Sequence, residues 1–223
     1  MKTAVALLSG IGNYTQGRRY TRDEIPASSD TESFDDYEKR TWRERMHHNE
    51  NGTLFIPPIA FKDCILTAAL KLRHTVPGKG KSEYGSFFKS TVSVGGSPQL
   101  LKGVMVTRKD KDGADEFIGW RDEKPFTDED VIPTTLYLPS NGVAGNGKRV
   151  DKVFGLIKNW HTTVTFLLGT DIIPEQEFKD TLLYASMFVG IGVYRPENGG
   201  YNGTFHIDKL TFSAFDINSL KAA

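Results

Sequence analysis

The alternation of apolar and polar residues predicts a strand at each end of the chain. A short apolar run predicts a buried first strand over residues 3–8, and alternation predicts a long final strand over residues 204–217. The apolar residues of the final strand fall into two alternating sets of opposite phase, first Phe205 and Ile207, then Leu210, Phe212 and Ala214. A change of phase within one strand needs an extra residue, so we expect a β-bulge at Asp208 and Lys209.

Helical spacing predicts two buried helices between these strands. Pro57 and Pro58 open the first helix, which is expected to run to about His74, because proline is tolerated in a first turn. The second is expected to run from Pro174 to Gly190. Their predicted buried stripes are Phe61, Ile65, Ala68 and Leu72 in the first helix, and Phe178, Leu182, Ala185 and Val189 in the second. The charged segment 32–47 predicts a third, exposed helix.

The middle of the chain predicts further strands separated by turns. We expect a hairpin of residues 87–94 and 101–107, and shorter strands at 53–56, 117–120, 134–138 and 162–168. Without the insertions, the elements follow the order β-α-β-β-α-β, which is that of the ferredoxin-like fold and of RNA-recognition domains. The predicted fold class is therefore α+β, as a single domain over residues 1–223 with insertions at about 10–52 and 108–160.

Composition excludes several classes of protein and site. The chain has 223 residues, with 28 Lys and Arg against 28 Asp and Glu, so it is not a polycation that binds by overall charge. Cys64 is its one cysteine, which excludes an internal disulfide and a cysteine-based zinc site. No apolar run approaches the roughly 18 residues of a membrane span. We expect a cytoplasmic protein with no membrane partner and no cofactor.

Charges are separated along the chain although they balance overall. Residues 62–111 are mainly basic, residues 112–130 are mainly acidic, and residues 148–158 are basic again. Such blocks predict a basic face and an acidic face on one molecule. Because complementary faces make head-to-tail contacts, they also predict self-assembly along a bound strand.

Three basic stretches carry glycine, aromatic residues or both: residues 14–22, 77–89 and 146–152. We expect them to line a groove. Arginine and lysine bind phosphates, aromatic rings stack on bases, and glycine lets the backbone approach phosphates closely. The candidate nucleic-acid-binding residues are Arg18, Arg19, Tyr20, Arg22, Lys62, Lys79, Lys81, Phe88, Lys89, Lys148, Arg149 and Lys152. The partner expected from this chemistry is single-stranded RNA or DNA.

Residues 56–62, at the start of the first buried helix, and residues 190–203, a glycine-rich loop after the second, carry a family resemblance. Together they resemble the RAMP superfamily of CRISPR systems, in particular the backbone subunit that coats guide RNA in effector complexes. The resemblance implies a ferredoxin-like core and a non-catalytic protein that coats a strand with little sequence specificity. A stand-alone relative that coats single-stranded DNA fits equally well.

Two other functions remain open from the sequence. An endoribonuclease would use His47 or His74 as a general base, as some RAMP relatives cleave RNA. An adaptor would use the acidic segment 112–130 to mimic nucleic acid. A nucleotide-binding phosphate loop at Gly80-Lys81-Ser82 is excluded, because Thr75 stands where that motif needs its first glycine.

Overall fold

The structure is a computed structural model that describes residues 1–15, 25–48, 54–95, 104–118, 131–140, 148–158 and 160–215. Its largest sheet has six antiparallel strands, of which four follow the order β11 (Phe205–Ala214), β1 (Lys2–Gly10), β10 (His161–Leu168) and β4 (Val92–Val94). The two terminal strands, which the sequence predicts, are therefore direct neighbours. The same edge of β10 also holds a short hairpin of β6 (Thr107–Lys109) and β7 (Asp115–Phe117).

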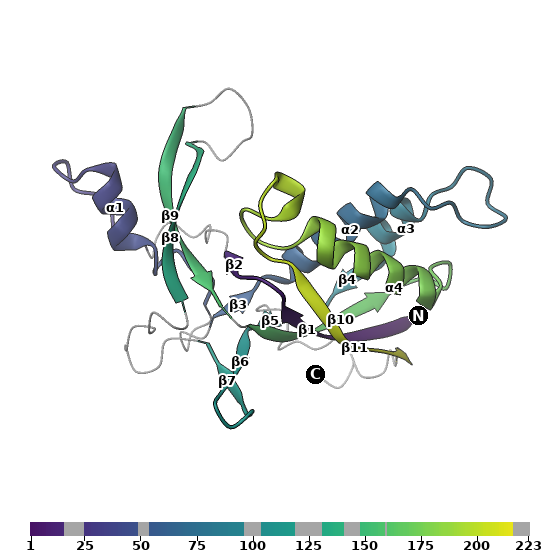
Figure 1. The fold of residues 1–223 in the computed structure, drawn as a ribbon. Coiled ribbons are helices and arrows are strands. Elements are labelled where there is room, and N and C mark those ends of the chain that lie inside the picture. The colour runs from purple at the N-terminus through teal and green to yellow at the C-terminus, as the bar shows by residue number, and fades with distance from the viewer. Residues whose placement is uncertain are drawn as a thin grey trace.

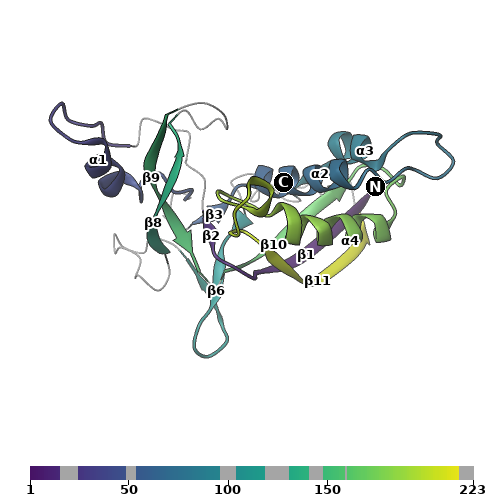
Figure 2. The same cartoon turned by 45° about the horizontal axis from the view of Figure 1, so that its top comes forward.

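Two helices cover one face of this sheet (Figures 1 and 2). They are α2 (Pro58–Leu72) and α4 (Glu175–Tyr184), and α4 continues into a π-helical turn, η3 (Ala185–Val189), that ends at Gly190. Both helices were predicted, and the buried positions include those of the predicted stripes except Leu72, which is half-buried. Among the described residues, no helix combines the length and the hydrophobicity that crossing a membrane requires.

The core between helices and sheet is built from aromatic and aliphatic side chains. Phe178 of α4 is fully buried and contacts Phe166 of β10 at 5.3 Å and Phe212 of β11 at 5.9 Å between ring centroids. At the other end of the sheet, Phe61 of α2 packs against Phe205. Full burial of one such side chain stabilises the fold by about 1.5–3 kcal/mol, so these contacts fix the helices on the sheet.

The predicted β-bulge in the last strand is confirmed. Leu7 of β1 faces Lys209 of β11, whereas the next residue, Leu8, faces Ile207, so Asp208 is the extra residue. The bulge lets Phe205 and Phe212, which lie seven positions apart, both face the helices.

The predicted hairpin of residues 87–94 and 101–107 is wrong. Residues 84–91 form a helix, α3 (Tyr84–Thr91), because Tyr84 and Phe88 bury one helical face. The following strand, β4, pairs with β10 about 70 positions later in the chain. The strand β5 (Val104–Met105) instead pairs with β3 (Phe55–Ile56).

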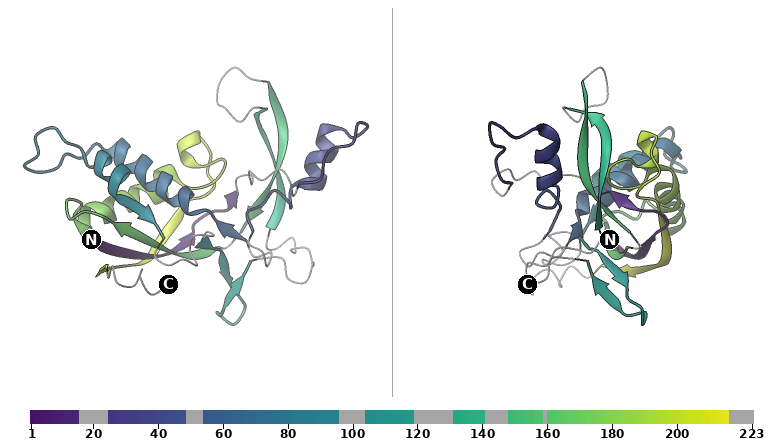
Figure 3. Two further views of the ribbon diagram at one scale, coloured as in Figure 1. Left: turned by 180° about the vertical axis from the view of Figure 1, so that it is seen from behind. Right: turned by 60° about the vertical axis from the view of Figure 1, so that its left-hand side comes forward.

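A second antiparallel sheet stands apart from the helix-covered sheet (Figure 3). It contains β2 (Tyr14–Thr15), β9 (Arg149–Ile157) and β8 (Val131–Pro139), in that order. The predicted strand at 134–138 lies within β8, whereas β9 was not predicted. The helix α1 (Phe34–Thr41), which lies within the predicted segment 32–47, packs beside this sheet.

Candidate nucleic-acid interface

Eight of the twelve predicted binding residues fall on described segments, and their charges are mostly unpaired. Arg18, Arg19, Tyr20 and Arg22 lie outside the described residues. Other cations, such as Lys71 and Arg73, form ion pairs with described carboxylates. Six of the eight candidates form no such pair: Lys62, Lys79, Lys81, Lys89, Lys148 and Arg149. An unpaired surface cation keeps its full attraction for a phosphate, so these positions remain candidates.

The connection between α2 and α3 presents Lys79 and Lys81 on a tight turn. Hydrogen bonds from Val76 N to Ser82 O and from Lys79 N to Val76 O close the turn. Gly78 and Gly80 adopt φ of 74° and 61°, which is the left-handed region that favours glycine. Both lysines are exposed as a result.

Phe88 belongs to the core and cannot stack on a base. Its side chain is 1% exposed and lies parallel to Phe178, with ring centroids 6.1 Å apart and an interplanar angle of 11°. Its neighbour Lys89 is exposed on the same helix. The basic part of this stretch is therefore available to a ligand, whereas its aromatic part is not.

The β8–β9 hairpin carries the other described basic stretch. Lys148 and Arg149 are exposed, and the Arg149 guanidinium donates to the carbonyl of Tyr137. The ammonium of Lys152 donates at 2.9 Å to the carbonyls of both Pro139 and Ser140, on the opposite strand. Lys152 thus ties the two strands together, while Lys148 and Arg149 face solvent.

The structure does not bring these two basic stretches together. The α2–α3 connection and the outer end of the β8–β9 hairpin lie far apart along the molecule in Figure 1 and in the left view of Figure 3. The expectation that both line one groove is therefore wrong for a groove within one molecule. A strand that touched both would have to run along the length of the molecule.

The glycine-rich loop of residues 190–203 presents an aromatic pair that the candidate list lacks. Tyr201 is 72% exposed and packs edge-to-face on Tyr194 with ring centroids 5.0 Å apart. The Arg195 guanidinium beside them pairs with Glu197 at 2.8 Å, so its charge is neutralised within the loop. This loop therefore offers a stacking surface and not a cation, and an isolated tyrosine among glycines was the signal that could have found it.

The loop is held in place by backbone contacts. The amide of Val193 donates to the carbonyl of Thr15, and the buried side chain of Asn202 donates to the Thr15 hydroxyl. A Cβ at Gly192 would collide with the Thr15 carbonyl, so glycine is required there. These contacts fix the exposed tyrosine at the junction between the two sheets.

Two histidines that could take part in acid–base chemistry, His74 and His161, have carboxylate partners. Nδ1 of His74 lies 3.1 Å from Glu177, and His47 packs against the ring of Phe55. A pair that the sequence did not single out is His161, whose Nε2 lies 3.0 Å from Asp115. No group of three or more histidine, cysteine, aspartate or glutamate side chains within the described segments could hold a metal ion.

Comparisons with known proteins identify no family for this chain. No family model matches it, and no curated protein matches it. Among solved structures, it resembles a chain in the cryo-EM structure of the Type III-B Cmr-beta bound to cognate target RNA. The TM-score is 0.44 at 10% sequence identity, over 96% of this chain and 62% of that chain. The protein thus spans less than two thirds of the length of that chain.

Proposed function

We propose that this protein binds single-stranded nucleic acid, RNA or DNA, and coats the strand without catalysis and with little sequence specificity. The observation that carries the proposal is the set of exposed cations without described carboxylate partners at two places far apart along the molecule, including Lys79, Lys81, Lys148 and Arg149. Phosphates of one strand are the partner that would pair with cations spaced along the whole molecule.

The fold supports a ferredoxin-like core for this function. The antiparallel order β11-β1-β10-β4, with α2 and α4 on one face, is the arrangement expected for β-α-β-β-α-β connectivity. The resemblance of residues 56–62 and 190–203 to RAMP proteins points in the same direction. Tyr201 adds an exposed ring that every base can stack on.

The proposed assembly on the strand depends on the nucleic acid more than on charge contacts between protomers. Within the described part of the acidic segment, Asp115 pairs with Lys109 at 2.6 Å and Glu116 with Arg108 at 2.9 Å. These acids are neutralised in their own hairpin and leave little charge for a neighbouring molecule. We therefore propose that a shared strand holds neighbouring protomers side by side.

Filter binding with labelled oligonucleotides tests the proposal. The protein should bind single-stranded RNA or DNA more tightly than duplex, with log K falling against log salt by about 0.7 per neutralised phosphate. Lys79→Ala with Lys81→Ala should reduce that slope by roughly 0.7–1.4. Lys71→Ala with Arg73→Ala is the matched control, because both of these cations are paired with glutamates. Equal slopes for the two double variants, or no binding by the wild type, would contradict the proposal.

An endoribonuclease is the second candidate, and the His74–Glu177 contact favours it. A carboxylate that orients one nitrogen of a histidine is the arrangement of a general base. Incubation with labelled RNA distinguishes the two functions. Product that disappears in His74→Gln would support the nuclease, whereas intact RNA in a stable complex supports binding alone.

A further inference from the structure

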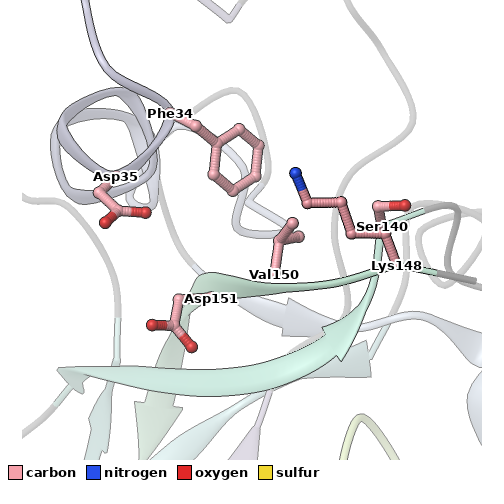
Figure 4. A pocket seen from close by; sticks show the side chains of 6 residues that line it. All are labelled: Phe34, Asp35, Ser140, Lys148, Val150 and Asp151. Atoms are coloured by element: carbon pink, nitrogen blue, oxygen red, sulfur yellow. The ribbon is translucent and has the colours of Figure 1, made fainter.

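A pocket lies between the start of α1 and the β8–β9 hairpin, and of its lining residues only Lys148 is among the candidate binding residues. Its volume is about 520 Å³. Figure 4 shows its lining, which comes from two segments more than 100 residues apart: Phe34, Asp35, Ser140, Lys148, Val150 and Asp151. A pocket of this size accommodates one nucleotide-sized group.

The walls of the pocket are held together by a buried glutamate. Glu38 on α1 is 1% exposed and pairs with Arg45 at 2.6 Å. The second carboxylate oxygen of Glu38 accepts a hydrogen bond from the amide of Val153 on β9 at 3.0 Å. The hydroxyl of Ser33 caps α1 by accepting from the amide of Asp36. The pocket is therefore preformed, which lowers the ordering cost of binding.

The lining combines three kinds of contact in one place. Phe34 is 47% exposed at the start of α1, so its ring has a face available for stacking. In Figure 4 the ammonium of Lys148 extends from one side toward this ring and the carboxyl group of Asp35 lies on the other side, whereas the carboxyl group of Asp151 points away from the ring. Lys148 has no described carboxylate partner. An aromatic ring, a cation and a carboxylate match the base, the phosphate and the base edge of a nucleotide.

The carboxylate of Asp35 decides which base fits. An ionised carboxylate only accepts hydrogen bonds, so it pairs best with a base edge that presents two adjacent donors. Guanine presents such an edge through its ring N–H and exocyclic amine. Adenine and cytosine place a ring acceptor beside their amine, and uracil places its one N–H between two carbonyls. Each of these three bases would bring a lone pair toward Asp35.

We propose that this pocket binds one guanine nucleotide of the bound strand. The base stacks on Phe34, its Watson–Crick edge faces Asp35, and Lys148 contacts the adjacent phosphate. The inference rests on the proposed function and adds to it one position per protomer at which the strand is read. Elsewhere, phosphate and stacking contacts leave binding insensitive to sequence.

Fluorescence anisotropy with two labelled 15-mers tests the pocket, one of uridine throughout and one with a single central guanosine. The wild-type protein should bind the guanosine strand about five- to tenfold more tightly. Asp35→Asn should bring the two affinities together, and Phe34→Ala should weaken the guanosine complex most. The controls are Asp63→Asn, which removes the same charge from the exposed face of α2, and Phe188→Ala, which removes a ring that is 61% exposed. Both should retain the preference.

The possible outcomes distinguish a failure of the pocket proposal from a failure of the proposed function. Equal wild-type affinity for the two strands would overturn the pocket and leave single-strand binding intact. A preference that survives Asp35→Asn would also overturn it, because another site would then read the base. Absence of binding to either strand would overturn the function and the pocket together. Far-UV circular dichroism of each variant shows that the fold is retained.

Discussion

The helix-covered sheet and the unit formed by α1 with the β8–β9 hairpin are stabilised by different forces. The first is packed by rings: Phe178 alone contacts Phe88, Phe166 and Phe212, and all of these contacts lie between apolar groups. In α1 the buried residues are Glu38 and Thr41, neither of which is apolar. The helix is held on the hairpin by a charged side chain that bonds to the backbone of β9.

The helix-covered sheet is therefore suited to stabilising the fold, and the α1–hairpin unit to binding a ligand. Apolar packing is insensitive to salt and tolerates little change, so it suits a scaffold. The α1–hairpin unit instead places an exposed ring, a cation and carboxylates around a pocket, which are the groups that contact a polar ligand. Mutations in the two regions should therefore have separable effects, on unfolding in the first and on binding in the second.

The largest effect is expected in the sheet core. Phe178→Ala removes a fully buried ring at the centre of three aromatic contacts and should lower the free energy of unfolding by about 3–5 kcal/mol. Urea denaturation followed by tryptophan fluorescence measures the change. Phe188→Ala is the control, since that ring is largely exposed. If both variants had the same urea midpoint, the aromatic cluster would not be the main stabilising element.

A smaller and local effect is expected at the attachment of α1. Glu38→Ala leaves Arg45 buried without its partner, at a cost of about 3 kcal/mol. Because Glu38 holds α1 on the hairpin, the loss should appear as faster amide exchange in residues 34–41, while exchange in β10 stays unchanged. Hydrogen–deuterium exchange with mass spectrometry resolves the two regions. Glu32→Ala, which removes the half-buried partner of the exposed Arg40, should leave both patterns as they are. Uniformly faster exchange throughout the protein would show that the two regions unfold as one unit.

The hairpin cations should change binding and not stability. Lys148→Ala with Arg149→Ala removes two exposed charges from the hairpin and should reduce the salt slope by roughly 0.7–1.4. The urea midpoint should not move, because neither side chain is buried. If the midpoint moved and the slope did not, these residues would belong to the structure of the hairpin and not to a binding surface.

The smallest effect concerns pH. Burial lowers the pKa of His161 below its ordinary value of 6.5, although Asp115 and Asp208 act in the opposite direction and Lys109 in the same one. The unfolded chain therefore takes up the proton more readily than the folded protein. The resulting contribution to stability is complete above pH 6.5 and decreases as the pH falls through the lowered pKa. Urea midpoints at pH 7 and pH 5 should differ less in His161→Gln than in the wild type. The same pH dependence in both proteins would contradict this, and His206→Gln, at an exposed histidine, is the control.

Local patterns predicted the regular parts of the fold. The helix opened by Pro58, the helix ended by Gly190 and the bulge at Asp208 each follow from spacing within a few residues. Tyr84 and Phe88 were missed as a helical face, because the β-branched residues after Lys89 suggested a continuous strand. The pairing between β4 and β10 could not be predicted from local sequence patterns, because the two strands lie about 70 residues apart in the chain.

The candidate site, too, could be predicted from the sequence only in part. Lysines beside glycines, such as Lys79 and Lys148, are visible in the sequence as exposed turns. Burial of Phe88 depends on Phe178, which lies 90 positions away, so its exclusion from the site needed the tertiary structure. Phe34 and Asp35 become part of a pocket only because Glu38 attaches their helix to β9.

The single extra residue at Asp208 has a consequence for how the chain can vary in length. Deleting it would turn Phe205 and Ile207 to the opposite face of the last strand, away from Phe61, while Leu210 and Phe212 stayed in place. No substitution elsewhere in the strand can compensate for such a half-turn. Insertions and deletions should therefore be rejected at this position, whereas the exposed turn at Lys79–Lys81 should accept them.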